Sequence, residues 1–252
     1  MIQISRLVIF LQLLTLPAYL LAAIPPTYQA QYELNKYGMT LAQSDVSFQK
    51  QSVGNWVYHS ETRLRGLASM FRKDHITEHS ELIENNGDLR TSRYAYTRKG
   101  KKKNRQLNLV FDWNKKIASN TISDDQWSLP LQNDTGDTFS LQLRIMADLA
   151  EGKRDLAYNI IDKGKLKTYQ FEILGEETIE VPAGSFKTLK IKRTRKNSSR
   201  TTLMWCSPEL NYLPVKIMHI ESDGSKFSLQ LTGLKGNITR NKTISASSSD
   251  DD

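Results

Sequence analysis

Cysteine is nearly absent from this sequence of 252 residues, and its scarcity excludes several classes of site. A lone Cys206 cannot build an internal disulfide framework, a cysteine-based zinc site or a cysteine-ligated cluster. The four histidines are scattered, so we expect no metal and no cofactor. We expect Cys206 to be buried and inert, because an exposed thiol in an oxidising compartment invites pairing between molecules.

Long apolar runs are also scarce. Hydrophobic residues make up 38% of the chain, which indicates a globular protein with much polar surface. After residue 23 no segment is apolar for 18 residues, so we expect a soluble mature form without a transmembrane segment. The 35 basic residues outnumber the 27 acidic ones, which leaves a formal charge of +8.

The first 23 residues have the order of a secretory signal peptide. Arg6 precedes an apolar run over residues 7–16, and the small residues Ala22 and Ala23 close the segment. No cysteine follows the run, so a lipoprotein anchor is not expected. We predict export, with cleavage after Ala22 or Ala23.

Alternation of apolar and polar residues recurs from residue 28 to residue 234, as in Leu107, Leu109 and Phe111. Glycine-containing turns such as Gly54-Asn55 and Asp223-Gly224 separate these stretches, so neighbouring strands must run antiparallel. The sequence predicts a mainly β protein with one strongly curved antiparallel sheet of about 11–12 strands. Such a sheet forms a barrel or half-barrel.

Two segments interrupt the alternation. Residues 137–150 have apolar side chains at helical spacing, with Asp137-Thr138 as the cap and Gly152 as the stop. Residues 64–72 are compatible with a shorter helix or a turn. One or two helices would plug or lid the sheet. We predict a signal peptide over 1–23, one β-rich domain over 24–236, and a disordered polar and acidic tail over 237–252.

No catalytic motif stands in a convincing context. His75 and His79 have a helical metal-ligand spacing, but they lie in a predicted strand, where residues four apart are ~13 Å from each other. The acidic pairs at residues 124–125 and 176–177 are neighbours in sequence and point apart. Ser222 and Lys226 lie in a predicted hairpin turn and are four residues apart, one more than in a Ser-x-x-Lys motif. We expect no catalytic residues and no enzymatic activity.

The strongest charge feature is a basic cluster over residues 98–105. It comprises Arg98, Lys99, Lys101, Lys102, Lys103 and Arg105. A solvated hairpin explains this cluster, and so does a site for an anionic envelope surface such as lipid headgroups. Nucleic acid is not expected as a partner of an exported protein.

Two stretches in the second half carry a family resemblance. They contain the patterns Pro182-Ala183-Gly184-x-Phe186 and Trp205-x-x-Pro208-x-x-x-Tyr212-x-Pro214, and residues 64–71 and 78–80 add a third match. With these motifs the chain resembles the exported bacterial family catalogued as domain of unknown function 3108, over residues 28–234. The resemblance implies a β-rich fold in the periplasm of a Gram-negative bacterium and no established activity. The motif residues themselves suit hairpin corners better than an active site.

Three functions remain open from the sequence. The first is a non-catalytic periplasmic protein that binds a lipid or another amphiphile, with Phe139, Leu143 and Met146 lining the cavity. The second is a structural or assembly factor that docks on envelope proteins or peptidoglycan. The third is a hydrolase whose site is assembled from distant residues. The sequence leaves the ligand, the closure of the sheet and the oligomeric state open.

Overall fold

The computed structural model describes residues 24–66, 69, 74–100, 104–122, 126–194 and 199–238. The predicted signal peptide and most of the predicted tail lie outside these residues. The strands are β1 (Tyr28–Lys36), β2 (Met39–Ser52), β3 (Asn55–Leu64), β4 (His75–Asn85), β5 (Asp88–Lys99), β6 (Arg105–Asp112), β7 (Ile117–Asn120), β8 (Trp127–Pro130), β9 (Gly136–Asp137), β10 (Leu156–Asp162), β11 (Lys165–Val181), β12 (Gly184–Thr194), β13 (Thr201–Ser207), β14 (Leu213–Ile220) and β15 (Lys226–Gly236). The helices are α2 (Leu141–Ala150) and a 3₁₀ helix (Pro208–Leu210).

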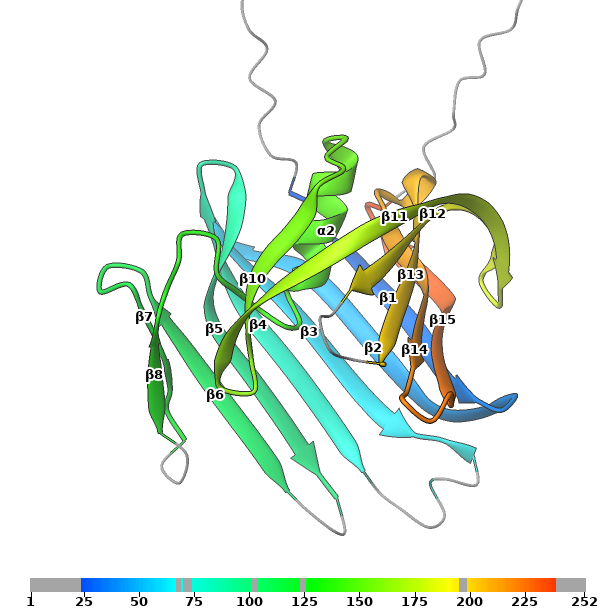
Figure 1. Ribbon diagram of the computed structural model, residues 1–252, viewed down its shortest axis with the longest axis horizontal. Helices are drawn as coiled ribbons and strands as arrows, with labels where there is room; N and C mark the ends of the chain where they lie inside the picture. The colour runs from blue at the N-terminus through cyan, green and yellow to red at the C-terminus, as the bar shows by residue number, and fades with distance from the viewer. Residues whose placement is uncertain are drawn as a thin grey trace, which may run out of the picture.

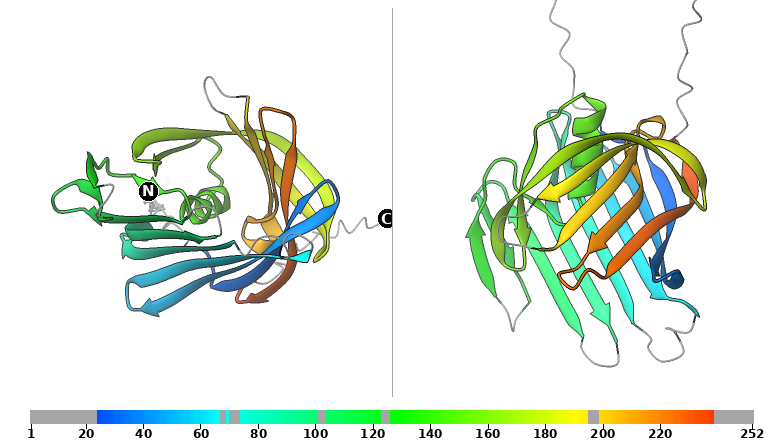
Figure 2. Two further views of the ribbon diagram at one scale, coloured as in Figure 1. Left: turned by 90° about the horizontal axis from the view of Figure 1, so that it is seen from below. Right: turned by 45° about the vertical axis from the view of Figure 1, so that its right-hand side comes forward.

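All fifteen strands belong to one sheet, in the order β8-β7-β6-β5-β4-β3-β2-β1-β15-β14-β13-β12-β11-β10-β9. Every pair is antiparallel except β9 with β10. The sheet curves until its two halves face each other, with α2 between them (Figures 1 and 2). It does not close, because β8 and β9 are both edge strands. The prediction of a mainly β fold with one strongly curved sheet is therefore confirmed, in the half-barrel form.

The predicted number of about 11–12 strands is wrong. The sheet has fifteen strands, and β7, β8 and β9 contain four, four and two residues. Alternation cannot identify strands this short, since a window of two to four residues shows no period. These strands exist because their backbones pair with neighbours that are already fixed in the sheet.

The half-barrel has two chemically different ends. The hairpin turns at residues 53–54, 86–87 and 113–116 lie at the end that carries α2, which we call the helix end. The turns at residues 37–38 and 221–225 lie at the opposite end, together with Lys99 and Arg105. We call this second end the basic end.

Asn237 N donates to Thr27 O at 2.9 Å and Ile238 is buried, so the chain stays against the helix end slightly beyond the predicted domain boundary.

Helix α2 is a wedge with apolar side chains directed to both halves of the sheet. Its buried residues are Leu141, Leu143, Ile145, Met146 and Leu149. Leu143 and Met146 pack in one core cluster, whereas Leu141, Ile145 and Leu149 pack in another with β10 to β13. A short helix of this kind is stabilised mainly by tertiary packing.

The helix begins later than predicted. Asp137 belongs to β9, and its carboxylate accepts the backbone N–H groups of Phe139 and Ser140, each at 2.8 Å. An aspartate that satisfies the next N–H groups in this way forms a turn before a helix, and α2 starts at Leu141.

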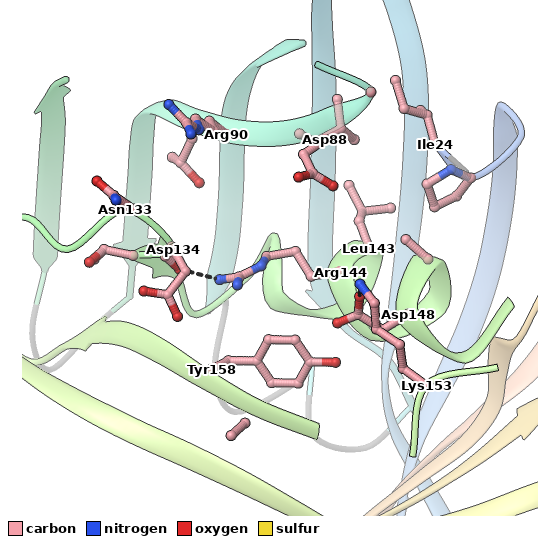
Figure 3. A pocket seen from close by; sticks show the side chains of 18 residues that line it. Ile24, Asp88, Arg90, Asn133, Asp134, Leu143, Arg144, Asp148, Lys153 and Tyr158 are labelled. Carbon is pink, nitrogen blue, oxygen red and sulfur yellow. Dashed lines mark hydrogen bonds and ion pairs between the residues drawn. The ribbon is translucent and has the colours of Figure 1, made fainter. Parts of the chain in front are cut away.

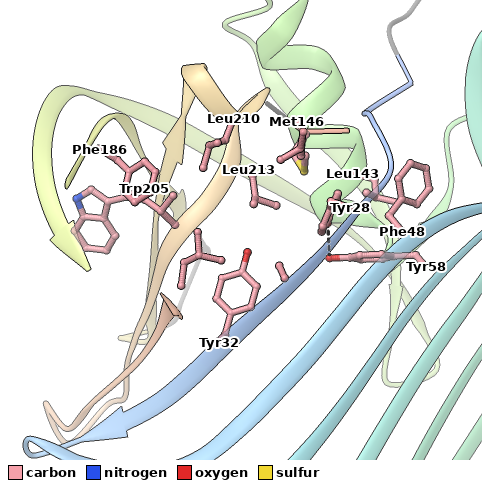
Figure 4. Packing of buried hydrophobic residues seen from close by; sticks show 14 of the residues in the cluster. Tyr28, Tyr32, Phe48, Tyr58, Leu143, Met146, Phe186, Trp205, Leu210 and Leu213 are labelled. Carbon is pink, nitrogen blue, oxygen red and sulfur yellow. Dashed lines mark hydrogen bonds between the residues drawn. The ribbon is translucent and has the colours of Figure 1, made fainter. Parts of the chain in front are cut away.

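The core beside α2 is rich in tyrosine, and Figure 4 shows its packing. Tyr28 and Tyr58 are each 1% exposed, and their hydroxyls are 3.3 Å apart. Tyr32 also faces inward from β1, and its hydroxyl donates to Pro214 O at 2.9 Å. A tyrosine core requires such partners because a buried hydroxyl without one destabilises the fold.

The two motifs that carry the family resemblance form corners of the sheet. β11 ends at Val181 and β12 starts at Gly184, so Pro182 and Ala183 make the turn. Pro208 opens the 3₁₀ helix, Asn211 adopts a left-handed conformation with φ 50°, and β14 starts at Leu213. The structural role predicted for these residues is thus confirmed.

Candidate functional site

A pocket of about 230 Å³ lies at the helix end, between α2, the start of β5 and the start of β10. One wall is apolar and includes Ile24, Leu89, Leu143 and Ala147. The other wall is polar, with side chains from the loop before β9, from α2 and from β10 (Figure 3). An apolar pocket with a few convergent polar groups is the usual form of a small-molecule site. Its volume is below the ~300–1,000 Å³ of most such sites, so it fits a small ligand or one end of a longer one.

Arg144 of α2 extends across this pocket. Its Nη1 donates to Asp134 O at 2.7 Å, and its guanidinium carbon lies 5.0 Å from the centre of the Tyr158 ring. Asp134 is held in turn by Asn159, whose Nδ2 lies 2.9 and 3.0 Å from its carboxylate oxygens. These contacts fix the guanidinium in one orientation at the polar wall.

Lys153 and Asp148 occupy the other side of the same wall. Lys153 Nζ lies 2.6 Å from Asp148 Oδ1 and 3.0 Å from Glu151 Oε2. The hydrogen bond with Asp148 raises the pKa of Lys153, so the ammonium stays charged. The pocket therefore presents fixed charges of both signs.

Tyr158 forms the floor of the pocket and is 2% exposed. Its hydroxyl oxygen is buried and interacts with the Asp148 carboxylate, without a hydrogen bond of ordinary length and angle among the described residues. Figure 3 shows this hydroxyl directed toward Asp148 and Lys153. Burial, followed by the negative charge of Asp148, raises the pKa of the hydroxyl, so it remains a neutral donor. Buried polar groups normally have partners, and the Tyr158 hydroxyl has the Asp148 carboxylate beside it.

Of the three residues predicted to line a cavity, Leu143 lines the pocket, whereas Met146 and Phe139 pack in the core. Met146 is fully buried and Leu143 is 1% exposed, although Leu143 also reaches the apolar wall of the pocket. Phe139 stacks on Tyr58 with ring centres 4.0 Å apart. Helix α2 fills the space between the two halves of the sheet, so these side chains contact the protein's own core.

The structure describes only some residues of the basic cluster. Lys101, Lys102 and Lys103 lie outside the described residues. Arg98 Nη2 donates to Asp74 Oδ2 at 2.6 Å, whereas Lys99 and Arg105 are exposed at the basic end. Arg105 also lies over the Tyr96 ring at 6.0 Å.

The sites that sequence patterns suggested for catalysis are dispersed. His75 and His79 lie on β4, as expected of a strand, and His79 faces His59 of β3 with ring centres 5.6 Å apart. Among the described residues, no group of three His, Cys, Asp or Glu side chains is placed to hold a metal ion. Glu177 is engaged by Lys190 Nζ at 3.0 Å and by Trp205 Nε1 at 2.5 Å, and these hydrogen bonds lower its pKa. Residues 124 and 125 lie outside the described residues.

Sequence reasoning missed the residues of the pocket. Asp134, Arg144 and Tyr158 come from a loop, a helix and a strand, and no spacing links them. Tyr158 alternates with Ile160 in β10 and looks like an ordinary inward residue. The only signal was a run of three polar residues, Asn133, Asp134 and Thr135, shortly before the predicted helix.

Within the described residues, no helix is long and apolar enough to span a membrane. No curated protein matches the sequence. The family model described as "Protein of unknown function (DUF3108)" matches residues 27–232.

Among solved structures, a β-barrel-like protein of the domain of unknown function DUF1849 from Brucella abortus is similar, with a TM-score of 0.57 at 9% identity. That similarity covers 86% of this chain and all of the other, and at this identity it shows the fold alone. The crystal structure of MucB matches with a TM-score of 0.34 at 12% identity, over 88% of this chain and 57% of MucB. This second similarity is too weak to establish a shared fold.

Proposed function

The chain belongs to the DUF3108 family, and from this premise we propose that it is a non-catalytic, periplasmic binding protein of the cell envelope. Its ligand is a small amphiphile, held in the pocket at the helix end. The observation that carries this proposal is the lining of the pocket, in which the Arg144 guanidinium, held by Asp134 O at 2.7 Å, lies opposite an apolar wall that includes Leu143.

The two walls of the pocket suit an amphiphile. Ile24, Leu89 and Leu143 offer apolar contact, while Arg144, Lys153 and Tyr158 offer hydrogen-bond donors opposite. The pocket also holds Asp88, Asp134 and Asp148, so its formal charges balance those of Arg90, Arg144 and Lys153. A ligand with a polar, hydrogen-bonding head and a short apolar part matches this lining better than a bare anion.

The filled core narrows the choice of ligand. Met146 and Leu149 occupy the interior that a long acyl chain would need, and both are fully buried. A lipid would have to place its chains outside the half-barrel and only its head in the pocket.

Native mass spectrometry of the mature protein, purified gently from the periplasm, tests the proposal. We expect a bound small molecule that Arg144→Gln no longer retains. Tyr158→Phe is the second variant, because it removes only the hydroxyl beside Asp148 and should change the stability of the free protein by no more than ~1 kcal/mol. Loss of the ligand together with unchanged or raised thermal stability supports a binding role.

The alternative is a structural or assembly factor that docks on envelope proteins or peptidoglycan. It predicts that the purified protein carries no bound small molecule. It also predicts that the Tyr158→Phe variant behaves as the parent in every binding assay. That pair of results would overturn the pocket as the functional site.

A further inference from the structure

The tip of the β1–β2 hairpin, residues 36–39, is the most apolar exposed feature among the described residues of the basic end. Tyr37 is 74% exposed and Met39 is 56% exposed. Both side chains project from a two-residue turn in which Tyr37 has φ 51° and Gly38 has φ 76°. Asn and Gly are favoured where both central residues have positive φ, because a β-carbon disfavours that conformation. The protein thus holds an aromatic ring in solvent at a position where the backbone disfavours it.

A basic hollow of about 390 Å³ adjoins this tip. Its lining includes Lys36, Lys226, Asn35, Ser228 and Gln230, and the lining contains no carboxylate. The pocket at the helix end has acidic and basic side chains in equal number, so the two hollows differ in charge.

The charged neighbours of the hollow leave it basic. Lys36 Nζ lies 4.3 Å from the Phe227 ring centre and 5.0 Å from the Tyr37 ring centre, contacts that fix the ammonium beside the tip. Asp223 interacts with Lys36, and its carboxylate accepts Ser225 N at 2.9 Å within its own turn. Glu33, which pairs with Gln230, is a second acid beside the hollow, and its carboxylate accepts Thr40 Oγ1 at 3.4 Å. At the next turn, Arg200 and Glu221 form an ion pair at 2.8 Å.

We infer that the β1–β2 tip docks the protein on an anionic lipid surface. Tyr37 and Met39 enter the interfacial layer, and Lys36 and Lys226 meet the head-group phosphates. Tyrosine is favoured at the membrane–water interface, and lysine beside it extends its charge toward the phosphates. The formal charge of +8 gives the whole chain the matching sign for an anionic membrane.

The position of the tip fits this orientation. Thr27 and Asn237 meet at the helix end, and the tip lies at the other end of β1 (Figure 1). With the tip on a membrane, the pocket at the helix end faces away from the lipid and stays open to bulk solvent. This inference is independent of the ligand proposed for that pocket.

Sedimentation of the mature chain with phosphatidylethanolamine–phosphatidylglycerol vesicles tests the inference, with phosphatidylcholine vesicles for comparison. We expect binding to the anionic vesicles that weakens as salt rises. Lys36→Gln with Lys226→Gln should weaken it about 30-fold, which corresponds to ~1 kcal/mol for each lysine near an anionic surface. Lys116→Gln with Lys187→Gln removes the same charge from exposed sites away from the tip and should leave the affinity unchanged.

A second pair of variants tests insertion of the apolar side chains. Tyr37→Ser with Met39→Ser should also lose binding, and Tyr37→Trp should show a blue-shifted fluorescence maximum on anionic vesicles only. The inference is overturned if phosphatidylcholine binds equally well, if the control pair weakens binding as much as Lys36 and Lys226, or if the serine variant binds normally. These positions are exposed, so loss of folding is not expected, and circular dichroism verifies that.

Discussion

The helix end and the basic end belong to one sheet, yet they use their side chains in opposite ways. At the helix end, α2 covers the inner face, and Met146 and Tyr28 are 0% and 1% exposed. At the basic end, Met39 and Tyr37 are mostly in solvent. The same two residue types stabilise the fold at one end and are available to a partner at the other. The difference shows that α2 buries the tyrosine and methionine side chains that pack against it, whereas Tyr37 and Met39 stay exposed at the end away from the helix.

Removal of the Asp137 carboxylate should have the largest effect, because this group fastens α2 and β9 to the opposite half of the sheet. It accepts hydrogen bonds from Ser80 Oγ, Thr91 Oγ1 and Ser140 Oγ, at 3.1, 2.7 and 2.5 Å, besides the two backbone bonds before α2. We expect Asp137→Ala to lower the free energy of unfolding by about 3–5 kcal/mol, since several buried donors lose their acceptor together. Urea unfolding measures this loss.

Asp134→Ala is the matched control, because Asp134 bonds Asn159 at the exposed edge of the pocket. It should change the stability by only ~0.5 kcal/mol. Equal losses for the two variants would show that Asp137 is not a fastener between the halves.

Truncation of a methionine at each end compares the two regions directly. Met146→Ala should cost about 2–4 kcal/mol, because it opens a cavity in a core that α2 fills. Met39→Ala should stay within ~0.5 kcal/mol of the parent, because its side chain is exposed. Thermal unfolding followed by circular dichroism measures both, and a large loss at Met39 would remove the distinction between the ends.

Glu78 lies on the inner face of β4 and makes the stability of the fold depend on pH, with a smaller expected effect. Burial raises the pKa of Glu78, and the hydrogen bond from Tyr94 at 2.7 Å offsets this only in part. The folded state therefore binds the proton more tightly than the unfolded state, and stability should fall as pH rises from the unfolded pKa through the folded one. Glu78→Gln should remove that fall and leave the variant more stable than the parent at neutral pH.

Chemical denaturation of the parent and of Glu78→Gln at a series of pH values measures this effect. Glu81→Gln on the outer face of the same strand is the control, and it should keep the parent's pH dependence. A parent whose stability rises over the same pH interval would contradict the expected sign.

The smallest expected effect concerns Cys206, whose thiol should not react with an alkylating reagent in the native protein. The residue is fully buried, and burial raises the pKa of its thiol to about 12. Because the thiolate is the reactive form, the native protein should resist alkylation at pH 8, whereas the urea-unfolded chain should react at once. Rapid labelling of the native protein, read by mass spectrometry, would place Cys206 in a part of the helix end that opens.

The sequence predicted the fold better than it predicted the site. The alternation of Leu107, Leu109 and Phe111 predicted a strand correctly, because β6 has one buried face. Pro208 and Asn211 predicted the turn before β14 correctly, because both residue types favour turns. Asp137 was read as a helix cap, but its partners Ser80 and Thr91 lie 57 and 46 residues away in sequence. No local pattern contains such a contact. Leu143 lines the pocket as predicted, but Met146 and Phe139 pack in the core, because an apolar helix face has the same sequence pattern whether it lines a space or fills one.

By itself the sequence determined a curved sheet of antiparallel hairpins, since local alternation and turn residues are enough to specify pairing between strands that follow each other in the chain. Only the tertiary structure decided that α2 fills the half-barrel, that Tyr158 is left facing a pocket, and that Tyr37 and Met39 remain in solvent. Those outcomes depend on which surfaces meet across the curved sheet, and contact between distant segments leaves no periodic trace in the chain.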